Sequence, residues 1–547
     1  MAALRAWAWA WPVCACAAAL CVAVAAGASH DSGAACSCRR READWVLDCS
    51  GRGRSALTPS DSCSGRTTKA DLSNNRFADP VILDPFIVDA NLSRNELTAL
   101  PCPVFLSNRT HTLDVSFNRI AHADTELRHF GALRTLAVSG NRLHTLGFLP
   151  APCQLLSLSA DRNQLRSTEV QGPLNGCHKL ERLDLSYNQL GPLHRGALAG
   201  LRNLRRLNLA NAGISRVNAD AFYDVHNLEL LFLSYNQLTT LPPRLCASLK
   251  ELEQLHLDGN QIDSLPADVF AGMKNVEVIS LDKNKLSQLP QGIFAGLEKL
   301  KYIILNRNQL TSLPGGIFAG LKNLEGVGLP SNQLKTLPHG VFSGLPSLKF
   351  IGLNDNKLTT LPAGLLEGIE TLGMLDLGAN QLSTVPAGLL RGVKTVEILD
   401  LSSNRLTAIS GADLAGPEKI KRLDLTRNLL KEVPAFSASW PQVEGCFLER
   451  NAVTEAREAE VRSWLGDGSR KRALVLGKEP RLRALGGLRW ALGDRRVNAT
   501  VDLADCSCGR ITRGRALVSF CAAVSCPRAA ADWKQAARGW EQRARKA

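Results

Sequence analysis

The chain has 547 residues, of which 45% are hydrophobic and 21% charged, with 16 cysteines and a formal net charge of +14. The excess positive charge is concentrated at one end, because residues 452–547 hold 20 Lys and Arg against 10 Asp and Glu. Beyond the first 28 residues no apolar run is long enough to span a membrane, which excludes a protein with several membrane-spanning helices.

The chain opens with MAALRAWAWAWPVCACAAALCVAVAAGASH, in which one arginine precedes a long apolar run and small residues follow at 26–28. This order is typical of a secretory signal peptide, and we expect residues 1–28 to be cleaved. The alternative is an uncleaved N-terminal anchor, since the apolar run approaches the length of a membrane span. Membrane association is otherwise expected only through a partner.

Residues 29–68 contain four cysteines. We interpret this segment as an N-terminal cap that closes the end of the repeated segment following it, residues 69–452. The four disulfide candidates are Cys36, Cys38, Cys49 and Cys63. Disulfides are favoured over a metal site, because the secretory route is oxidising and the spacing lacks two C-x-x-C motifs. We expect no metal site and no cofactor.

Residues 69–452 repeat one unit, L-x-x-L-x-L-x-x-N-x-L-x-x-L-P-x-x-x-F-x-x-L, about seventeen times. Steps of 24 residues run from Asn188 to Asn428, with Ala212 in one asparagine slot, and the spacing before Asn188 is looser. Such a period indicates a solenoid, in which each unit buries its leucines only against its neighbours. The asparagine amide is expected to bond backbone groups that would otherwise be buried without partners.

These units resemble the typical extracellular class of leucine-rich repeats, found in Toll-like receptors, Slit-type guidance proteins and lamprey variable lymphocyte receptors. The resemblance implies an α/β solenoid, a horseshoe with a parallel β-sheet on its concave face, a disulfide-rich N-terminal cap and a small C-terminal cap domain. It further implies recognition, adhesion or ligand capture. In that family a C-x-C pair and a later cysteine form the N-terminal disulfides, and here Cys63 substitutes for an absent cysteine.

The remaining cysteines fall inside the repeats or near the C-terminus. Cys177, Cys246 and Cys446 occupy apolar slots and are predicted to be small buried hydrophobes, whereas Cys102 and Cys153 lie off the pattern and are free to pair. Further disulfide candidates are Cys506, Cys508, Cys521 and Cys526. Three sequons, at Asn91, Asn108 and Asn498, are glycosylation candidates, with chance occurrence as the alternative.

No catalytic motif is present: the chain lacks G-x-S-x-G, H-E-x-x-H and a phosphate-binding G-x-x-x-x-G-K-[ST]. Aspartates recur in the strands, and we interpret them as water-facing residues rather than a carboxylate cluster. They are Asp184, Asp258, Asp282, Asp376, Asp400 and Asp424. The sequence therefore predicts a protein that is not an enzyme.

Variable strand positions lie six, four, two and one residues before each asparagine, and we expect them to share the concave face. The candidate ligand-binding residues there are Leu230, Phe232, Tyr235, His256, Asp258, Val278, Asp282, Tyr302, Ile304, Arg307 and Phe350. Exposed apolar side chains beside charges are typical of protein-binding hot spots, although sheet propensity alone also favours them. Gly326 and Gly328 are expected to leave a hollow between Tyr302 and Phe350.

The basic region 453–547 has two interpretations. The first is the solvated surface of a small cap, with Trp533 and Trp540 packed inward and a helix over 455–465 closing the last repeat. The second is contact with acidic glycans or another anionic partner.

We therefore expect a secreted or cell-surface protein that binds a protein ligand on its concave face without catalysis. The alternatives are an extracellular-matrix component that binds acidic glycans through its basic end, and an inhibitor of a secreted hydrolase. Nucleic acid is not expected as a partner, given the secretory route.

Overall fold

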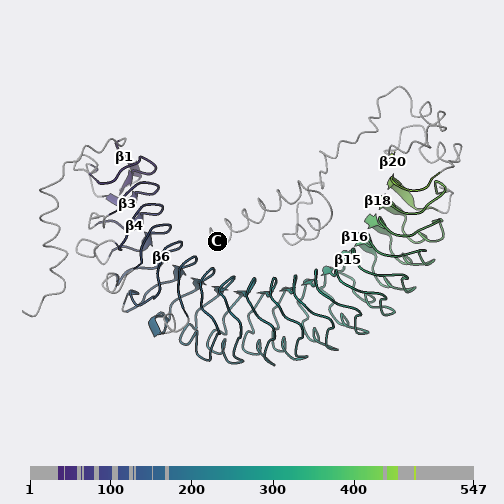
Figure 1. Ribbon diagram of the computed structural model, residues 1–547, viewed down its shortest axis with the longest axis horizontal. Helices are drawn as coiled ribbons and strands as arrows, with labels where there is room; N and C mark the ends of the chain where they lie inside the picture. Colours follow the sequence, from purple (N-terminus) through teal and green to yellow (C-terminus); the bar gives the residue numbers. More distant parts are fainter. Residues whose placement is uncertain are drawn as a thin grey trace, which may run out of the picture. The chain divides into compact units, whose positions relative to one another are not determined.

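The computed structural model in Figure 1 describes residues 35–41, 44–57, 63, 67–78, 86–100, 109–121, 127, 131–150, 152–166, 172–434, 440–453 and 473–475. The signal-peptide segment, Cys102, Asn108, the helix expected over 455–465 and everything after residue 475 lie outside the described residues, including Asn498 and the four C-terminal cysteines. Within the described part, no helix is long and apolar enough to cross a membrane.

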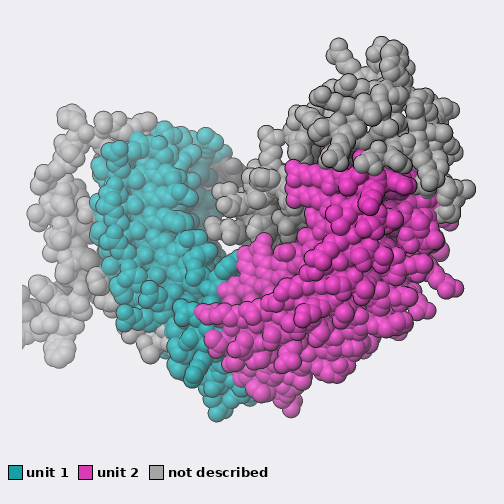
Figure 2. All heavy atoms as spheres, turned by 45° about the vertical axis from the view of Figure 1, so that its right-hand side comes forward, with its two compact units in different colours: residues 1–238, 245–252 teal, residues 239–244, 253–547 magenta. Residues whose placement is uncertain are grey.

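The chain divides into two compact units, coloured separately in Figure 2. Unit 1 comprises residues 1–238 and 245–252, and unit 2 comprises residues 239–244 and 253–547. The strands of unit 1 are β1 (Ser37–Arg41), β2 (Asp44–Asp48), β3 (Thr67–Asp71), β4 (Asp89–Asn91), β5 (Thr112–Asp114), β6 (Thr135–Ala137), β7 (Ser157–Ser159), β8 (Arg182–Asp184), β9 (Arg206–Asn208) and β10 (Leu230–Phe232). The strands of unit 2 are β11 (Gln254–His256), β12 (Val278–Ser280), β13 (Tyr302–Ile304), β14 (Gly326–Gly328), β15 (Phe350–Gly352), β16 (Thr371–Asp376), β17 (Thr395–Asp400), β18 (Lys419–Asp424), β19 (Gln442–Phe447) and β20 (Ala473–Val475).

Within each unit the strands pair in chain order. In unit 1, β1 is antiparallel to β2, and every later pair from β2 to β10 is parallel. In unit 2, all pairs from β11 to β20 are parallel. The register places equivalent repeat positions side by side, as in Val278, Tyr302, Gly326 and Phe350. This arrangement confirms the predicted leucine-rich repeat solenoid with a parallel sheet.

The middle residue of each short strand is buried, and its two neighbours point to the other side of the sheet. Behind the strands of unit 2, Phe270, Phe294, Phe318 and Phe342 stack from repeat to repeat with ring centroids 6.2, 6.2 and 5.8 Å apart. Each such side chain contributes about 1.5–3 kcal/mol by leaving water. No single repeat could bury its ring, so the stacking of neighbours holds the core together.

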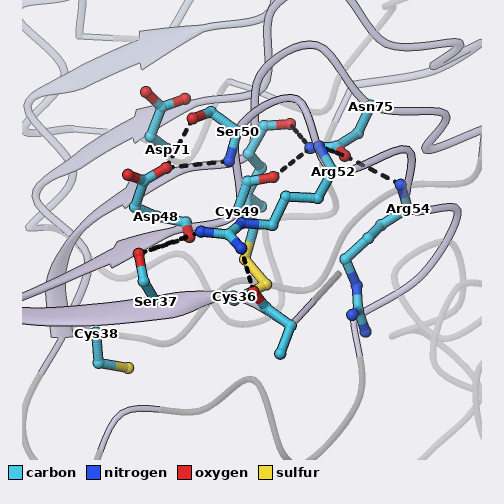
Figure 3. The surroundings of a disulfide bond; sticks show 12 residues. Cys36, Ser37, Cys38, Asp48, Cys49, Ser50, Arg52, Arg54, Asp71 and Asn75 are labelled. Atoms are coloured by element: carbon cyan, nitrogen blue, oxygen red, sulfur yellow. Dashed lines mark hydrogen bonds between the residues drawn. A yellow bond between two sulfur atoms is a disulfide. The ribbon is translucent and has the colours of Figure 1, made fainter. Parts of the chain in front are cut away.

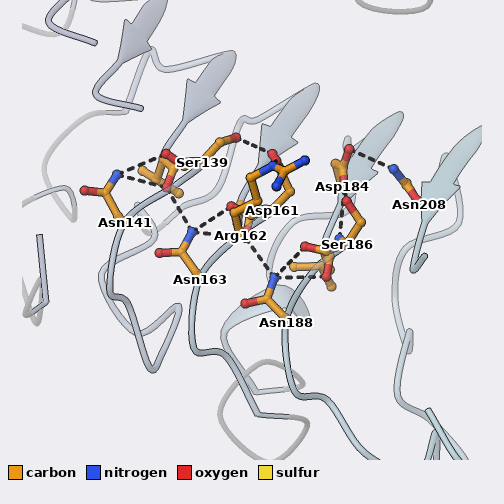
Figure 4. Close-up of polar contacts among 12 residues, drawn as sticks. Ser139, Asn141, Asp161, Arg162, Asn163, Asp184, Ser186, Asn188 and Asn208 are labelled. Atoms are coloured by element: carbon orange, nitrogen blue, oxygen red, sulfur yellow. Dashed lines mark hydrogen bonds and ion pairs between the residues drawn. The ribbon is translucent and has the colours of Figure 1, made fainter. Parts of the chain in front are cut away.

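The repeat asparagines tie each turn to the one before it, as predicted. Asn308 Nδ2 donates to the carbonyl of Leu305 in its own repeat at 3.1 Å and to that of Leu281 in the preceding repeat at 2.9 Å. Its Oδ1 accepts from the backbone N–H of Leu286, also in the preceding repeat, at 3.0 Å. Figure 4 shows the same ladder in unit 1 at Asn141, Asn163 and Asn188.

Ala212 interrupts this ladder, and its own backbone carbonyl takes over the acceptor role, because the N–H of Leu190 donates to it at 2.8 Å. Asn236 Oδ1 accepts from the backbone N–H groups of both Ala212 and Ile214, each at 3.0 Å. In the regular repeats of unit 2 only the second of these bonds is made, as from Leu286 to Asn308. The ladder therefore continues through the substituted repeat.

The outer segments between strands are mostly turns rather than regular helices in the part of the chain that the structure describes. Buried leucines such as Leu265 anchor each outer segment, and the following proline prevents a regular helix from continuing there. The α component of the expected α/β class is accordingly small.

The N-terminal cap is held by two disulfides, Cys36–Cys49 and Cys38–Cys63, the first of which appears in Figure 3. The cap joins the repeats through Asn75, whose Oδ1 accepts from the backbone N–H of Arg52 at 3.1 Å and of Arg54 at 3.0 Å. The asparagine ladder thus extends into the cap, and all four N-terminal disulfide candidates are paired.

Inside the repeats, the prediction for Cys177 was wrong. Cys177 forms a disulfide with Cys153, 24 residues earlier, instead of serving as a free buried hydrophobe. The separation equals one repeat period, so the two residues meet on adjacent turns. Cys246 and Cys446 are free and buried, as predicted, and burial raises the pKa of both thiols.

The sheet of unit 2 continues one strand beyond the last predicted repeat. Residues 473–475 form β20, which pairs in parallel with β19 so that Leu474 lies opposite Cys446. The C-terminal segment that follows Asn451 therefore supplies at least one more strand to the solenoid.

We predict that Asn308→Ala lowers the free energy of unfolding by about 2–4 kcal/mol, because it leaves the Leu286 N–H without an acceptor and removes the link between two repeats. Urea denaturation followed by circular dichroism measures the change. The exposed neighbour Gln309→Ala is the control, with an expected change below about 0.5 kcal/mol. Equal effects of the two substitutions would contradict the structural role of the ladder.

Candidate binding face

The candidate binding face is the side of the sheet opposite the buried middle residues. Figure 1 places β15, β16 and β18 on the inner side of unit 2. The first and third residues of each short strand, such as Val278 and Ser280 of β12, belong to this inner face. Because all strands are in register, these residues form columns that run from strand to strand.

The eleven predicted residues are divided between the units. Leu230 and Phe232 are half-buried at the two ends of β10 in unit 1, and Tyr235 follows them with 51% of its surface exposed. The other eight belong to unit 2. Tyr235, like Arg307, has a left-handed backbone conformation at the position just before the repeat asparagine.

Tyr302 and Phe350 are not exposed, contrary to prediction. They retain only 8% and 9% of their surface. The Tyr302 hydroxyl donates to Glu325 Oε2 at 2.9 Å, and burial together with Glu325 raises its pKa. The Phe350 ring lies against Gly373 of the next strand, where an added Cβ would be only 2.8 Å from Phe350 Cε1. Both rings thus lie along the face instead of standing out from it.

The hollow expected over Gly326 and Gly328 stays a prediction. Gly326 and Gly328 are buried. A small hollow of this face lies beside Phe350 of β15 and Met374 of β16. It is lined by Pro330, Phe350, Ile351, Gly352, Asn354, Met374 and Asp376. Asn354, Met374 and Asp376 are not among the eleven predicted residues, although the alternation that selects Phe350 also selects Met374 and Asp376.

The polar candidates of β11–β13 are partly buried. Nε2 of His256 lies 3.2 Å from Oε1 of Gln254, and burial lowers the pKa of the His256 imidazole. Burial raises the pKa of Asp282, against the opposing effect of Lys283 and Arg307. Val278, Ile304 and Asp258 are half-buried, and Arg307 is exposed.

Three aspartates interpreted as water-facing are instead buried. Asp376, Asp400 and Asp424 end β16, β17 and β18 in register and expose only 3%, 9% and 8% of their surface. Burial, followed by the charges of Asp400 and Asp424, raises the pKa of Asp376 to about 7. Asp424 is paired with Arg422 at 2.9 Å, and the Arg422 guanidinium lies 4.3 Å from the centre of the Phe447 ring. Like residues at one repeat position have therefore produced a column of like charges.

Other sequence candidates can be located in part. Asn91 is half-buried on β4, where its Oδ1 accepts from the Ser93 hydroxyl at 2.7 Å; its glycosylation stays a prediction. Within the described residues, no group of three His, Cys, Asp or Glu side chains is arranged to hold a metal ion.

Comparison with known proteins places the chain in a family. The family model described as "Leucine rich repeat" matches seven overlapping segments that together span residues 153–430, just over half of the chain. This chain belongs to the leucine-rich repeat family. No curated protein sequence matches it.

Solved structures of other leucine-rich repeat proteins share the fold. A Leptospira interrogans leucine-rich repeat protein, LIC12759, is 26% identical with a TM-score of 0.53, covering 70% of this chain and 90% of that one. Drosophila Toll in its complex with Spatzle is 19% identical with a TM-score of 0.57, covering 77% of this chain and 66% of that one. PEPR1 in its complex with AtPEP1 is 20% identical with a TM-score of 0.50, covering 76% and 65%.

We predict that Asp376→Asn stabilises this leucine-rich repeat protein at pH 8 but not at pH 4. The pKa of Asp376 is about 7 in the folded state and about 3.9 when unfolded, so the folded state binds the proton more tightly. Wild-type stability is therefore lost as pH rises from 4 to 7, by about 2–4 kcal/mol, whereas the amide does not titrate.

Urea midpoints of both proteins at pH 4, 6 and 8 measure this difference. Asp355→Asn, at an exposed aspartate on the neighbouring repeat, is the matched control and should shift the midpoint little at any pH. If the stability difference between wild type and Asp376→Asn did not grow with pH, the raised pKa of Asp376 in the folded state would be contradicted.

Proposed function

We propose that this leucine-rich repeat protein is secreted or displayed at a cell surface, where it binds a protein ligand on the inner face of unit 2 without catalysis. The observation that carries the proposal is a set of half-buried apolar side chains on this face, Val278, Ile304, Met374 and Ile398. Met374 and Ile398 lie on β16 and β17, the strands that end in Asp376 and Asp400. Apolar groups next to charges on a fixed sheet supply both contact area and orientation for a protein partner.

Three disulfides support an oxidising compartment. Cys36–Cys49, Cys38–Cys63 and Cys153–Cys177 are all formed, and such bonds persist mainly in secreted and extracellular proteins. The signal peptide expected from residues 1–28 agrees with this compartment.

The partners of the structural neighbours bear on the ligand class. Toll was solved with Spatzle and PEPR1 with AtPEP1. TLR13, 19% identical with a TM-score of 0.50, was solved with ssRNA13 and covers 75% of this chain and 74% of that one. The expected exclusion of nucleic acid is therefore not supported, and we favour protein because the inner face of unit 2 carries buried carboxylates that would repel phosphates.

The inner-face double variant Ile304→Ser, Ile398→Ser should weaken partner binding at least about tenfold, because two apolar contacts are lost. The full chain is used to capture proteins from extracellular material, and the dissociation constant of the recovered protein is then measured for each variant. Ala271→Ser, Ala319→Ser carries two serines on exposed outer turns and should bind like the wild type. Undiminished binding by the inner-face variant would overturn the proposal.

A second function is favoured by the charge of residues 452–547, which hold 20 Lys and Arg against 10 Asp and Glu. If this region anchors the protein to acidic glycans, the full chain is retained on heparin at physiological salt, and deletion of residues 476–547 abolishes the retention. Retention that survives the deletion would exclude this role for the basic region. No observation specifically favours inhibition of a hydrolase.

A further inference from the structure

The hollow on the inner face of unit 2 combines apolar walls with polar acceptors. Pro330, Phe350 and Met374 form apolar sides, and Gly352 contributes no side chain. The polar side chains in the lining are those of Asn354 and Asp376. A group that fits this hollow therefore needs an apolar stem, which contacts the walls, and hydrogen-bond donors at its end.

Unpaired acceptors recur on this face. Oδ1 of Asp282, of Asn306 and of Asn354 is buried with no hydrogen-bond partner, and each lies two residues before a repeat asparagine. A buried acceptor without a donor destabilises the folded state. The described part of unit 2 leaves no buried side-chain donor without a partner, so the unpaired atoms of this column are all acceptors.

Asp376 is the ionisable side chain in the lining. It is 3% exposed, and its Oδ1 accepts from the backbone N–H of Gly378 at 3.0 Å. A Cβ added to Gly378 would lie 3.2 Å from Oδ1 of both Asp376 and Asp400, so the two carboxylates converge over this glycine. The cation nearest in register, Arg422, pairs with Asp424 instead. Buried carboxylates are normally paired, and among the described residues no cation forms an ion pair with Asp376.

The size of the hollow selects the kind of cation. Its volume of about 10 Å³ admits one water-sized group. A lysine ammonium is a compact point charge with three donors on a flexible apolar stem, whereas the arginine guanidinium is a planar fork that needs more room.

We propose that this hollow binds the side-chain ammonium of a lysine on the protein partner, with the lysine stem against Phe350 and Met374 and the ammonium donating to Asp376 and Asn354. This assignment rests on the proposed protein-binding function and adds the chemistry that the partner must present. The ammonium supplies the donors and the positive charge that the lining lacks.

The test uses the full chain and three pools of fluorescein-labelled heptapeptides with a central lysine, arginine or acetyl-lysine, the other positions being mixed and free of lysine and arginine. At pH 8 the lysine pool should bind at least about tenfold more tightly than the other two in fluorescence anisotropy. Asp376→Asn should reduce binding of the lysine pool about tenfold, because the amide keeps the acceptor for Gly378 but loses the charge. Asp355→Asn, at an exposed carboxylate outside the hollow, should change it less than about twofold.

Equal binding of the lysine and arginine pools, absence of binding by the lysine pool, or an unchanged affinity of Asp376→Asn would each overturn the lysine assignment. Circular dichroism verifies that each variant is folded. The broader function is judged separately by capture with the Ile304 and Ile398 variant. Failure of the peptide test with capture intact therefore rejects the lysine site alone.

Discussion

The hydrogen bonds of one asparagine per repeat are the constraint on which the rest of the structure depends. Each side chain joins two neighbouring turns, as Asn308 does through Leu281 and Leu286, and it satisfies backbone groups that would otherwise be buried without partners. Only a side chain with a donor and an acceptor on one short stem can make both kinds of bond. At the one substituted position, the backbone carbonyl of Ala212 accepts from Leu190 in place of an asparagine side chain, and Asn236 accepts from the Ala212 N–H.

A fixed ladder also fixes the register, and the register turns repeat positions into columns. Charges then meet their counterparts one period away. In the column formed by the residue just before each strand, Nζ of Lys301 lies 2.7 Å from Oε1 of Glu277, and Nζ of Lys349 lies 3.9 Å from Oε2 of Glu325. Alternation of sign in this column therefore yields ion pairs. At the ends of β16–β18 the sign does not alternate, and three carboxylates stand side by side. A repeat protein thus obtains its electrostatic pattern directly from which residues recur at 24-residue spacing.

The sequence was sufficient for the features that follow from one period. The asparagine role, the buried leucines and the free buried Cys246 and Cys446 were all predicted from the pattern, and the pairing of the N-terminal cysteines was predicted from the secretory context and the family resemblance. The Cys153–Cys177 disulfide was missed because the spacing is irregular in that part of the chain, so that the one-period separation did not stand out.

The candidate site was harder to predict, because alternation identifies the face on which a side chain lies but not its direction along the column. That direction depends on the size of the neighbour. Phe350 leans onto Gly373, which has no side chain to oppose it, and Tyr302 reaches Glu325 beside Gly326. At these two positions the large side chain extends along the sheet toward a glycine of the next strand.

The same rule explains where the inner face is open. In the column formed by the last residue of each strand, Gly328 and Gly352 precede Asp376. Asp376 therefore has the carboxylate of Asp400 on one side and only a glycine on the other. Neither glycine takes part in the asparagine ladder, and substitution there leaves the links between repeats in place. The scaffold and the recognition surface are consequently encoded at different positions of one short repeat, and small residues among the variable positions decide where a partner side chain can enter.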